Sequence, residues 1–278
     1  MANSDTLSVF GIHEAGPLII EPLQGESLAM QVTTVVETNG RDYRIPLITS
    51  DPSAAWLNEN DEIPLSEEAA DSVLVVPAKI AGLSVIPNEL ANDTSPEAAN
   101  LIGQGLARDI GRKIDAAFFG AKPAAGSPQP LGLDALTAET VINADPTLGT
   151  DAFVDALAAA ESVGAPVDAW VTDPATAKSL AKLKQGTSSN LPLFGTGATN
   201  GIQRDVLGVP LFVNPNVLAG TVWGVPKTRV FTVLRQDVTI DIDKSRYFEF
   251  DQTAIRAVLR LAWGFPQPQS VVKIKKTS

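Results

Sequence analysis

The feature that most constrains the fold of this chain is the continuous stretch 54–133, in which three physical states follow one another. An acidic, loop-like segment gives way to an apolar segment of β-branched residues that ends near residue 86. A long helix follows, predicted from Pro96 to Phe119, and it stops at Gly120. This order predicts a projecting polar loop, then a strand of the core, then a long helix packed on that core.

The predicted helix has start and stop signals of its own. Ser95 suits the N-cap, Pro96 the first helical position, and Glu97 the positive end of the helix dipole. Gly120 stands at the C′ position, where glycine is common. The 24 residues would make a rod of about 36 Å at 1.5 Å per residue.

The faces of this helix differ in character. Apolar residues recur at spacings of one or four, which predicts a single stripe packed against a core. These residues are Leu101, Ile102, Leu106, Ile110, Ile114 and Phe118. Other faces carry Gln104, Arg108, Arg112 and Asp115. Because Arg108 and Arg112 lie one turn apart, we expect them to form a basic ridge on the outside.

The negative charge of the chain is concentrated in its first quarter. Residues 1–78 hold 13 acidic and 2 basic side chains and so account for the whole net charge of −11. Residues 79–278 hold 19 acidic and 19 basic side chains. A segment this acidic repels DNA and acidic membranes. It is either a solvated, partly mobile region or an arm and loop that lie on basic surfaces of neighbouring subunits.

The N-terminal part contains an arm and a hairpin. Residues 1–30 show no sustained periodicity and are expected to form an extended arm. Alternation from Gln31 predicts a strand. Asn39-Gly40 then predicts a tight hairpin turn, because both residues tolerate positive φ, and residues 41–48 would pair back as the second strand.

Trp56 is the one large apolar residue in the polar, acidic segment 49–71. A tryptophan in such a loop either folds back on its own hairpin or inserts into another subunit, since aromatic residues are favoured at the centres of interfaces. The apolar segment 73–86 that follows reads as a buried strand or strand pair.

The second half of the chain changes pattern twice. The Pro/Gly/Ser-rich residues 123–130 are a plausible domain boundary. Short strands and helices then alternate up to about residue 235, which predicts a compact α/β lobe. Long strands return over 238–276, and residues 247–250 are expected to continue that strand pattern. The fold class expected is therefore α+β.

Candidate catalytic and ligand-binding residues are few. Cysteine is absent, which excludes disulfides and thiolate metal sites, and His13 is the only histidine. The glycine-rich segment 195–201 has the wrong spacing for a phosphate loop and leads into no helix. Asp241, Asp243 and Asp251 lack the oxygen-rich loop and closing glutamate of a calcium site. We expect no catalytic, cofactor or metal site.

Targeting and membrane signals are also missing from the sequence. The first residues lack the basic start and apolar run of a signal peptide. The most apolar window, 73–87, is interrupted by Pro77 and Lys79 and is too short to span a bilayer. We expect no membrane partner.

A series of short motifs runs in a fixed order along the chain. It comprises Trp56 and Glu59, Ile63-Pro64, Val76-Pro77-Ala78-Lys79, Ile86-Pro87-Asn88-Glu89-Leu90, the helix end Asp115-Ala116-Ala117-Phe118-Phe119-Gly120, the step Pro130-Leu131-Gly132-Leu133, and the late strands with Ala254-Ile255-Arg256-Ala257 and Arg260-Leu261. This ordered set resembles the tailed-bacteriophage major capsid protein family and covers nearly the whole chain from about residue 30.

The resemblance implies the Hong-Kong-ninety-seven-like capsid fold. The expected parts are an N-terminal arm at 1–30, an extended β-hairpin loop at 31–78, a peripheral domain with the long spine helix at 79–130, an α/β axial domain at 131–235, and strands that return to the peripheral domain at 236–278.

The resemblance also implies a function. The chain would be a major capsid protein that self-assembles, as pentamers and hexamers, into the icosahedral shell that encloses phage double-stranded DNA without sequence-specific binding. Assembly would take place in the host cytoplasm, with the virion capsid as the final location. The arm starts at Met1, whereas some members carry a scaffolding segment before it. Either a separate scaffold protein takes part in assembly, or the chain is a trimmed form, and a separate scaffold and a portal protein are the partners expected.

An interface follows from the acidic hairpin on this reading. Its acids would face basic groups of a neighbour, with the tryptophan inserted nearby, and no lysine in 31–78 is available for a covalent cross-link. Non-covalent contacts are therefore expected. The expected interface residues are Trp56, Glu59, Asp61, Glu62, Glu67, Glu68, Arg108 and Arg112.

Three other functions remain in competition at this point. An encapsulin-like nanocompartment shares the fold but stores cargo enzymes, and a neighbouring cargo gene would favour it. A small α/β enzyme would use the lobe at 131–235, where no catalytic constellation supports it. A secreted adhesin is disfavoured by the absent signal peptide.

Overall fold

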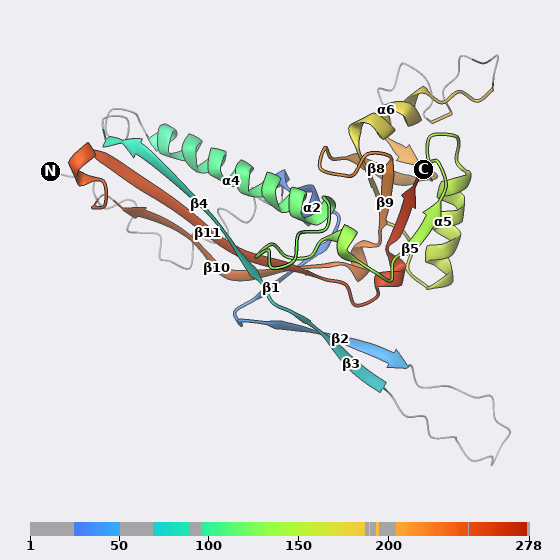
Figure 1. The fold of residues 1–278 in the computed structure, drawn as a ribbon, viewed down its shortest axis with the longest axis horizontal. Helices are drawn as coiled ribbons and strands as arrows, with labels where there is room; N and C mark the ends of the chain where they lie inside the picture. The colour runs from blue at the N-terminus through green and yellow to red at the C-terminus, as the bar shows by residue number, and fades with distance from the viewer. Residues whose placement is uncertain are drawn as a thin grey trace, which may run out of the picture.

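The strands of the chain form three sheets in the computed structural model, which describes residues 25–50, 69–88, 96–186, 189, 193–194, 204–243 and 245–276 (Figure 1). The first sheet has the order β1 (Thr34–Thr38), β10 (Phe231–Asp243), β11 (Gln252–Gly264) and β4 (Ala78–Pro87). The second has the order β5 (Thr140–Asn143), β12 (Val272–Lys275), β9 (Thr221–Val225), β6 (Ala169–Thr172), β8 (Val209–Val213) and β7 (Asp205–Val206). The third pairs β2 (Tyr43–Ser50) with β3 (Ala69–Val75).

The helices of the described residues differ greatly in length. The α-helices are α2 (Leu28–Gln31), α4 (Pro96–Phe119), α5 (Asp151–Ser162) and α6 (Pro174–Lys182). Short 3-10 helices occupy connections and are η1 (Leu133–Ala135), η2 (Lys227–Arg229), η3 (Phe248–Phe250) and η4 (Pro268–Ser270).

Helix α4 lies along one face of the four-stranded sheet (Figure 1). Its predicted bounds are confirmed, and the part of the apolar stripe whose side chains are described is buried, at Ile110, Ile114 and Phe118. Each such side chain contributes roughly 1.5–3 kcal/mol on burial. The helix approaches β4 closely, because a Cβ added at Gly82 would overlap the side chain of Leu106. The helix and sheet therefore form one packed unit.

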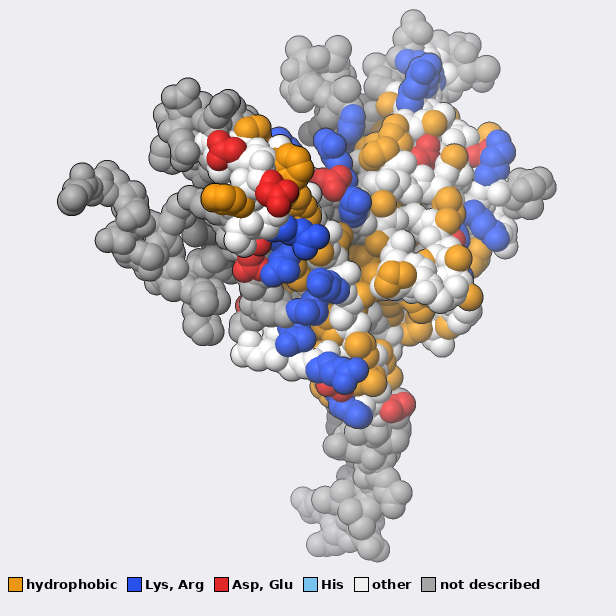
Figure 2. Space-filling model, turned by 60° about the vertical axis from the view of Figure 1, so that its left-hand side comes forward, with side chains coloured by type: hydrophobic (Ala, Val, Ile, Leu, Met, Phe, Trp, Pro, Cys, Tyr) orange, Lys and Arg blue, Asp and Glu red, His pale blue; other side chains and the backbone are white. Residues whose placement is uncertain are grey.

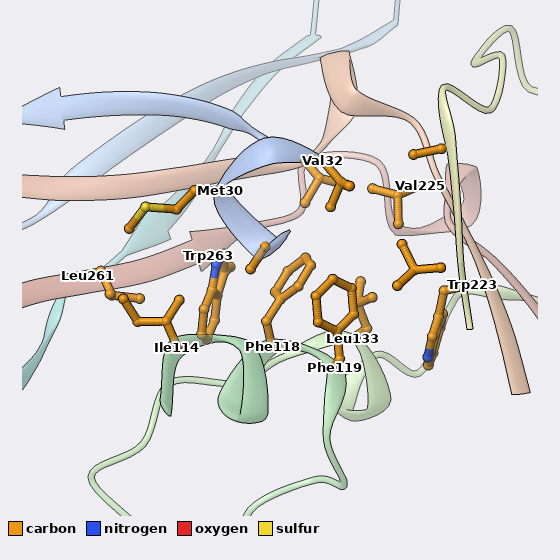
Figure 3. Close-up of a cluster of buried hydrophobic side chains, with 14 of the residues drawn as sticks. Met30, Val32, Ile114, Phe118, Phe119, Leu133, Trp223, Val225, Leu261 and Trp263 are labelled. Atoms are coloured by element: carbon orange, nitrogen blue, oxygen red, sulfur yellow. The ribbon is translucent and has the colours of Figure 1, made fainter. Parts of the chain in front are cut away.

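The two larger sheets share a core at the end of α4 (Figure 3). The ring centroid of Phe118 lies 5.0 Å from that of Trp263 on β11 and 4.8 Å from that of Phe119. Trp223 of β9 and Leu133 of η1 belong to the same cluster. Because one apolar cluster contains residues of both sheets, the first sheet and the second sheet are held in a fixed relation.

The second sheet has its own helical layer. Phe153 of α5 packs edge-to-face on Trp170 of β6, with ring centroids 5.2 Å apart. Helix α6 begins at Pro174, where the Asp173 side chain accepts hydrogen bonds from the backbone N of Ala175 and Thr176. The predicted α/β lobe is thus present, and α5 and α6 cover its sheet (Figure 1).

Hairpin β2–β3 projects away from both larger sheets (Figure 1). Its base is fixed by a small cluster in which Ile45 and Val75 pack against Val233 of β10 and Ala262 of β11. A Cβ at Gly264 would overlap Ile45 and come within 2.8 Å of Val75. This close approach explains a glycine at the end of β11.

The predicted hairpin turn at Asn39-Gly40 is wrong. Strand β1 pairs in parallel with β10, and β2 pairs with β3 instead. Neither Asn39 nor Gly40 is among the described residues with positive φ, which a type I′ turn requires. Val35 packs against the main core, so a long-range pairing with β10 overrides the local turn preference.

Four further expectations need correction. β12 lies in the second sheet between β5 and β9, so the last strand does not return to the sheet beneath α4. Residues 248–250 form the 3-10 helix η3, because the chain must turn there between two antiparallel strands. Strand β4 is not buried on both faces, since its burial alternates along the strand. Gly120 does not adopt positive φ; an added Cβ would overlap the carbonyl oxygen of Ala116.

Candidate assembly interface

The predicted interface residues fall into two groups. Trp56 and the acidic residues Glu59, Asp61, Glu62, Glu67 and Glu68 lie outside the described residues, between the ends of β2 and β3. Arg108 and Arg112 are described, and both are exposed. The structure therefore brings the two arginines together on α4 and leaves the acidic side of the predicted contact untested.

The arginines belong to a ridge on the solvent side of α4. Lys113 is exposed beside them, and its Nζ lies 3.9 Å from Oδ2 of Asp109. An exposed pair of this kind contributes about 0.3–0.5 kcal/mol. The α4 ridge, defined as Arg108, Arg112, Lys113 and Asp109, therefore keeps an excess of positive charge and can attract an acidic segment.

A second basic surface lies on the face of the four-stranded sheet that α4 does not cover. Arg235, Arg260 and Lys79 stand directly opposite one another on β10, β11 and β4. Like charges in direct opposition disfavour strand pairing. This basic row lies two residues along the strands from the base of the hairpin, at Val233 and Ala262. Figure 2 shows Lys and Arg side chains gathered in a column that leads down toward the hairpin.

Sequence reasoning did not identify the basic row as a surface. Its signal was present in β11, where Arg256 and Arg260 share a face because they are separated by an even number of residues. Arg256 also forms an exposed ion pair, in which its Nη2 lies 2.6 Å from Oδ2 of Asp241 on β10. The row could not be assembled without knowing which strands are neighbours.

Asp115 is a buried junction that the sequence prediction placed on a polar face of the helix. Its Oδ1 accepts hydrogen bonds from Ser27 Oγ (2.7 Å) and from the backbone N of Ala29 (3.0 Å). Its Oδ2 accepts from the backbone N of Leu28 (3.2 Å) and from Asn214 Nδ2 (2.8 Å). One carboxylate thus joins α2, α4 and the segment that follows β8.

A second buried link fixes the last strand. Lys273 Nζ lies 2.6 Å from Asp134 Oδ1, and the two side chains are only 13% and 19% exposed. The same ammonium group lies 4.8 Å from the ring centroid of Trp223, and the backbone N of Lys122 donates to the other oxygen of Asp134. This link joins β12 and β9 to the segment that follows α4.

The carboxyl group of Asp145 sits in a turn close to this strand. The Thr147 hydroxyl donates a hydrogen bond to it at 2.6 Å, and Lys276 Nζ lies 2.9 Å away. These contacts, with the Thr147 hydroxyl as the largest cause, lower the pKa of Asp145 to about 2. These contacts stabilise the carboxylate within a local turn.

Other kinds of site find no support within the described ranges. There, no three His, Cys, Asp or Glu side chains lie close enough together to bind a metal ion. In the same part of the chain, every helix is too short or too polar to cross a membrane.

One family model and several solved structures match this chain. The model described as the phage capsid family matches residues 14–276. A search of curated proteins gives no match. A solved structure from Microbacterium phage Oxtober96 is similar with a TM-score of 0.71, at 17% identity, over 91% of each chain.

Two further solved structures give similar values. One from Mycobacterium phage Bobi has a TM-score of 0.68 at 19% identity over 91% of each chain. A chain described as the capsid of a native GTA particle has a TM-score of 0.67 at 18% identity over 89% of each chain. At these identities, the structural similarity concerns the fold.

Proposed function

This chain belongs to the phage capsid family, and we propose that its copies are held together without covalent cross-links, by hairpin β2–β3 lying on a neighbouring copy. The chain is a major capsid protein, a structural protein whose copies form the icosahedral shell of a bacteriophage. The predicted Hong-Kong-ninety-seven-like fold is confirmed. The proposal concerns how the copies are joined.

We propose that the domains of the subunit follow the sheets, so that each segment belongs to the domain whose sheet it joins. The expected arm at 1–30 and extended loop at 31–78 are shortened, because α2 (Leu28–Gln31) packs in the main core and β1 (Thr34–Thr38) pairs with β10. The arm then ends before α2, and the extended loop begins after β1. The peripheral domain consists of α4, β4, β10 and β11, which share one packed unit. The axial domain consists of residues 131–230, up to the start of β10, together with β12, which lies within its sheet.

The observation that carries the proposal is the isolation of the hairpin from its own body. Only its base packs on the described residues, through Ile45 and Val75. The segment 51–68 that joins its two strands has six acidic residues and no basic one. The hairpin would bury little apolar surface by packing against its own subunit, so this packing would not offset the loss of conformational entropy. An acidic segment is, in contrast, attracted to a basic surface such as Arg108 and Arg112.

The strength of such a contact comes from repetition. Each exposed ion pair is worth about 0–1 kcal/mol, so a single contact is weak. Head-to-tail contacts of this type close into rings, and we propose that pentamers and hexamers close in this way. Trp56 would supply the apolar anchor of each contact.

The wider setting belongs to the same proposal. The shell would assemble in the host cytoplasm with separate scaffold and portal proteins and would enclose double-stranded DNA without reading its sequence. We propose no catalytic role for the chain.

The test reverses the charge of the α4 ridge in the variant Arg108→Glu/Arg112→Glu. At low salt we expect the concentration needed for shell assembly to rise by about tenfold, which corresponds to about 1.4 kcal/mol. The measurement is the yield of shells by electron microscopy and sedimentation. A matched control is Lys178→Glu/Lys182→Glu, an exposed pair with the same spacing on α6.

Two further arms make the result specific. Adding Glu67→Arg/Glu68→Arg to the ridge variant should restore assembly, because the signs of the contact are exchanged. In 1 M salt the difference between the ridge variant and the parent should vanish, since the Debye length falls to about 3 Å. A ridge variant that assembles like the parent at low salt would show that the hairpin does not lie on Arg108 and Arg112.

A further inference from the structure

The Asn39-Gly40 pair predicts a tight turn that the chain does not form, so its place in the fold calls for another explanation. Strand β1 ends at Thr38 and β2 begins at Tyr43, so the pair lies in the connection between the first sheet and the hairpin. Both residues are exposed. Among the described strands, neither residue takes part in the pairing of β1 with β10 or of β2 with β3. The pair therefore lacks the ladder of backbone hydrogen bonds that holds the strands on either side.

The backbone nitrogen of Gly40 is accessible to the side chain that precedes it. Its N–H donates to Oγ1 of Thr38 at 3.1 Å in an exposed hydrogen bond, which water can replace at little cost. Within the part of the chain that the structure describes, no hydrogen bond holds the Asn39 carboxamide. A Cβ added at Gly40 would lie 3.0 Å from the backbone oxygen of Asp42, so the connection favours a residue whose nitrogen has no side chain beside it.

A free carboxamide followed by an accessible glycine nitrogen is the arrangement from which asparagine forms a succinimide. Hydroxide removes the amide proton of Gly40, the nitrogen forms a bond to Cγ of Asn39, and Nδ2 takes a proton from water and leaves as ammonia. Water then opens the five-membered ring. Cleavage of the bond from the nitrogen to Cγ gives aspartate, whereas cleavage of the bond to the backbone carbonyl carbon gives isoaspartate, whose main chain runs through Cβ. Water is the only other reactant, and the missing Cβ of glycine eases ring closure.

We propose that Asn39 is a site of spontaneous modification, at which an isoaspartyl link changes how the hairpin is attached to the first sheet. This link adds one carbon atom to the main chain of a connection that comprises only residues 39–42. The longer connection holds β2 less firmly beside β10, against which Ile45 packs at the base of the hairpin. The modification concerns the covalent structure of a single chain, so it does not depend on the contact between copies proposed above.

The first experiment follows the conversion of Asn39 in the free subunit during incubation at mildly alkaline pH. The chain also contains Asn200-Gly201, so the readout is a peptide and not the mass of the whole chain. A protease that cleaves before aspartate yields the peptide 5–41, in which Asn39 is the only asparagine. Aspartate at this position creates a new cleavage point, whereas isoaspartate leaves the peptide whole but heavier, so mass spectrometry separates the two products.

Three comparisons decide the result. Conversion at Asn39 should be at least tenfold faster than at Asn143, which is also exposed but ends β5 and is followed by alanine. The variant Gly40→Ala should slow the conversion of Asn39 at least tenfold. The rate in the folded subunit should lie within threefold of the rate in the chain unfolded by urea, because the fold leaves the pair accessible. A folded subunit that converts at least tenfold more slowly than the unfolded chain would overturn the proposal, as would equal rates at Asn39 and Asn143.

The second experiment measures how the modified hairpin is attached, by amide hydrogen exchange in the incubated subunit. Exchange in β2 and β3 should be at least threefold faster in modified than in unmodified molecules, while α5 keeps its protection. The matched control Asn39→Gln has a side chain one methylene longer, which closes a ring far more slowly, and its exchange should not change during incubation. Equal exchange in modified and unmodified molecules would refute the changed attachment.

Discussion

Replacing Asp115 with asparagine tests whether one buried carboxylate holds the N-terminal segment, the long helix and the second sheet together. The side chain keeps its size, so no cavity is created. One oxygen becomes an NH₂ group that donates hydrogen bonds. Each carboxylate oxygen accepts two hydrogen bonds in the structure, so whichever oxygen is replaced, two donors lose their acceptor.

The neighbouring side chains cannot easily adapt to this change. Asn214 could turn its amide so that its oxygen faced the new NH₂ group. That oxygen already accepts from the backbone N (2.9 Å) and from Nδ2 (3.0 Å) of Asn216, so the turn would break two hydrogen bonds to restore one. On the other side, the backbone N of Ala29 is fixed in α2 and is buried.

The size of the effect follows from the donors left without an acceptor. A buried donor without a partner costs about 1–3 kcal/mol, and the two remaining hydrogen bonds lose the strength that a charged acceptor gives them. We expect a loss of about 3–5 kcal/mol in the free energy of unfolding. With an entropy of unfolding near 2.1 cal/mol/K per residue, this lowers the midpoint of thermal unfolding by about 5–9 °C.

Calorimetry of the free subunit, with Asp109→Asn as the control, measures this effect. Asp109 lies on the same helix, is exposed, and sits 3.9 Å from Lys113, so its replacement should cost no more than about 0.5 kcal/mol. Amide hydrogen exchange should accelerate at Leu28 and Ala29 in the Asp115 variant, while α5 keeps its protection. Equal midpoints for the two variants would refute the idea that Asp115 joins the three elements.

Two further predictions concern the hairpin base and the acid limit. Gly264→Ala should destabilise the subunit by about 1–3 kcal/mol, because the new Cβ overpacks against Ile45. This loss should appear as faster amide hydrogen exchange in β2 and β3. The control Gly149→Ala, which has no atom within 4 Å of the new Cβ, should leave the exchange rates unchanged. The pKa of Asp145 is lowered to about 2, so its stabilising contribution is complete above about pH 4 and is lost as the pH falls toward 2. Thr147→Val should raise the pKa of Asp145 and move this loss to higher pH in carboxyl NMR titrations, whereas an unchanged titration would contradict the role of the hydroxyl.

Elements with strong local signals could be predicted from the sequence. The long helix has its stripe and its terminal signals within one stretch of chain, and its bounds agree with the structure. Asp173-Pro174 carries the start of α6 in two adjacent residues, and the side-chain cap is formed. In these cases the decisive interactions join residues that are close in sequence.

Strand partners could not be predicted in the same way. Asn39-Gly40 is a strong local turn signal, but β1 pairs with β10, almost two hundred residues later. The alternation of β12 gave no indication of its sheet, and the strand lies between β5 and β9. A period of two identifies a strand and its faces, whereas its neighbours depend on the packing of the whole chain.

The candidate interfaces show the same division. The exposure of Arg108 and Arg112 follows from the helical period, and both are exposed. Asp115 stands on the same helix, but its partners are 86 to 99 residues away, so its burial has no local signal. Phe248 and Phe250 read as strand residues, and their exposure follows only from the turn that closes two long strands.

The position of the hairpin in the sheet order shows how a contact at its tip would act on the subunit. The chain enters the hairpin from β1 and leaves it into β4, and these are the two edges of the four-stranded sheet. Only residues 39–42 separate β1 from β2, and only residues 76–77 separate β3 from β4. The base of the hairpin is also packed on β10 and β11 through Ile45 and Val75, so a large rotation of the hairpin would have to move these strands or break that packing. A neighbour that turns the hairpin therefore displaces both edges of the sheet, and with them α4, which packs closely on β4 at Gly82. The hairpin contact would in this way set the curvature of each subunit in the shell.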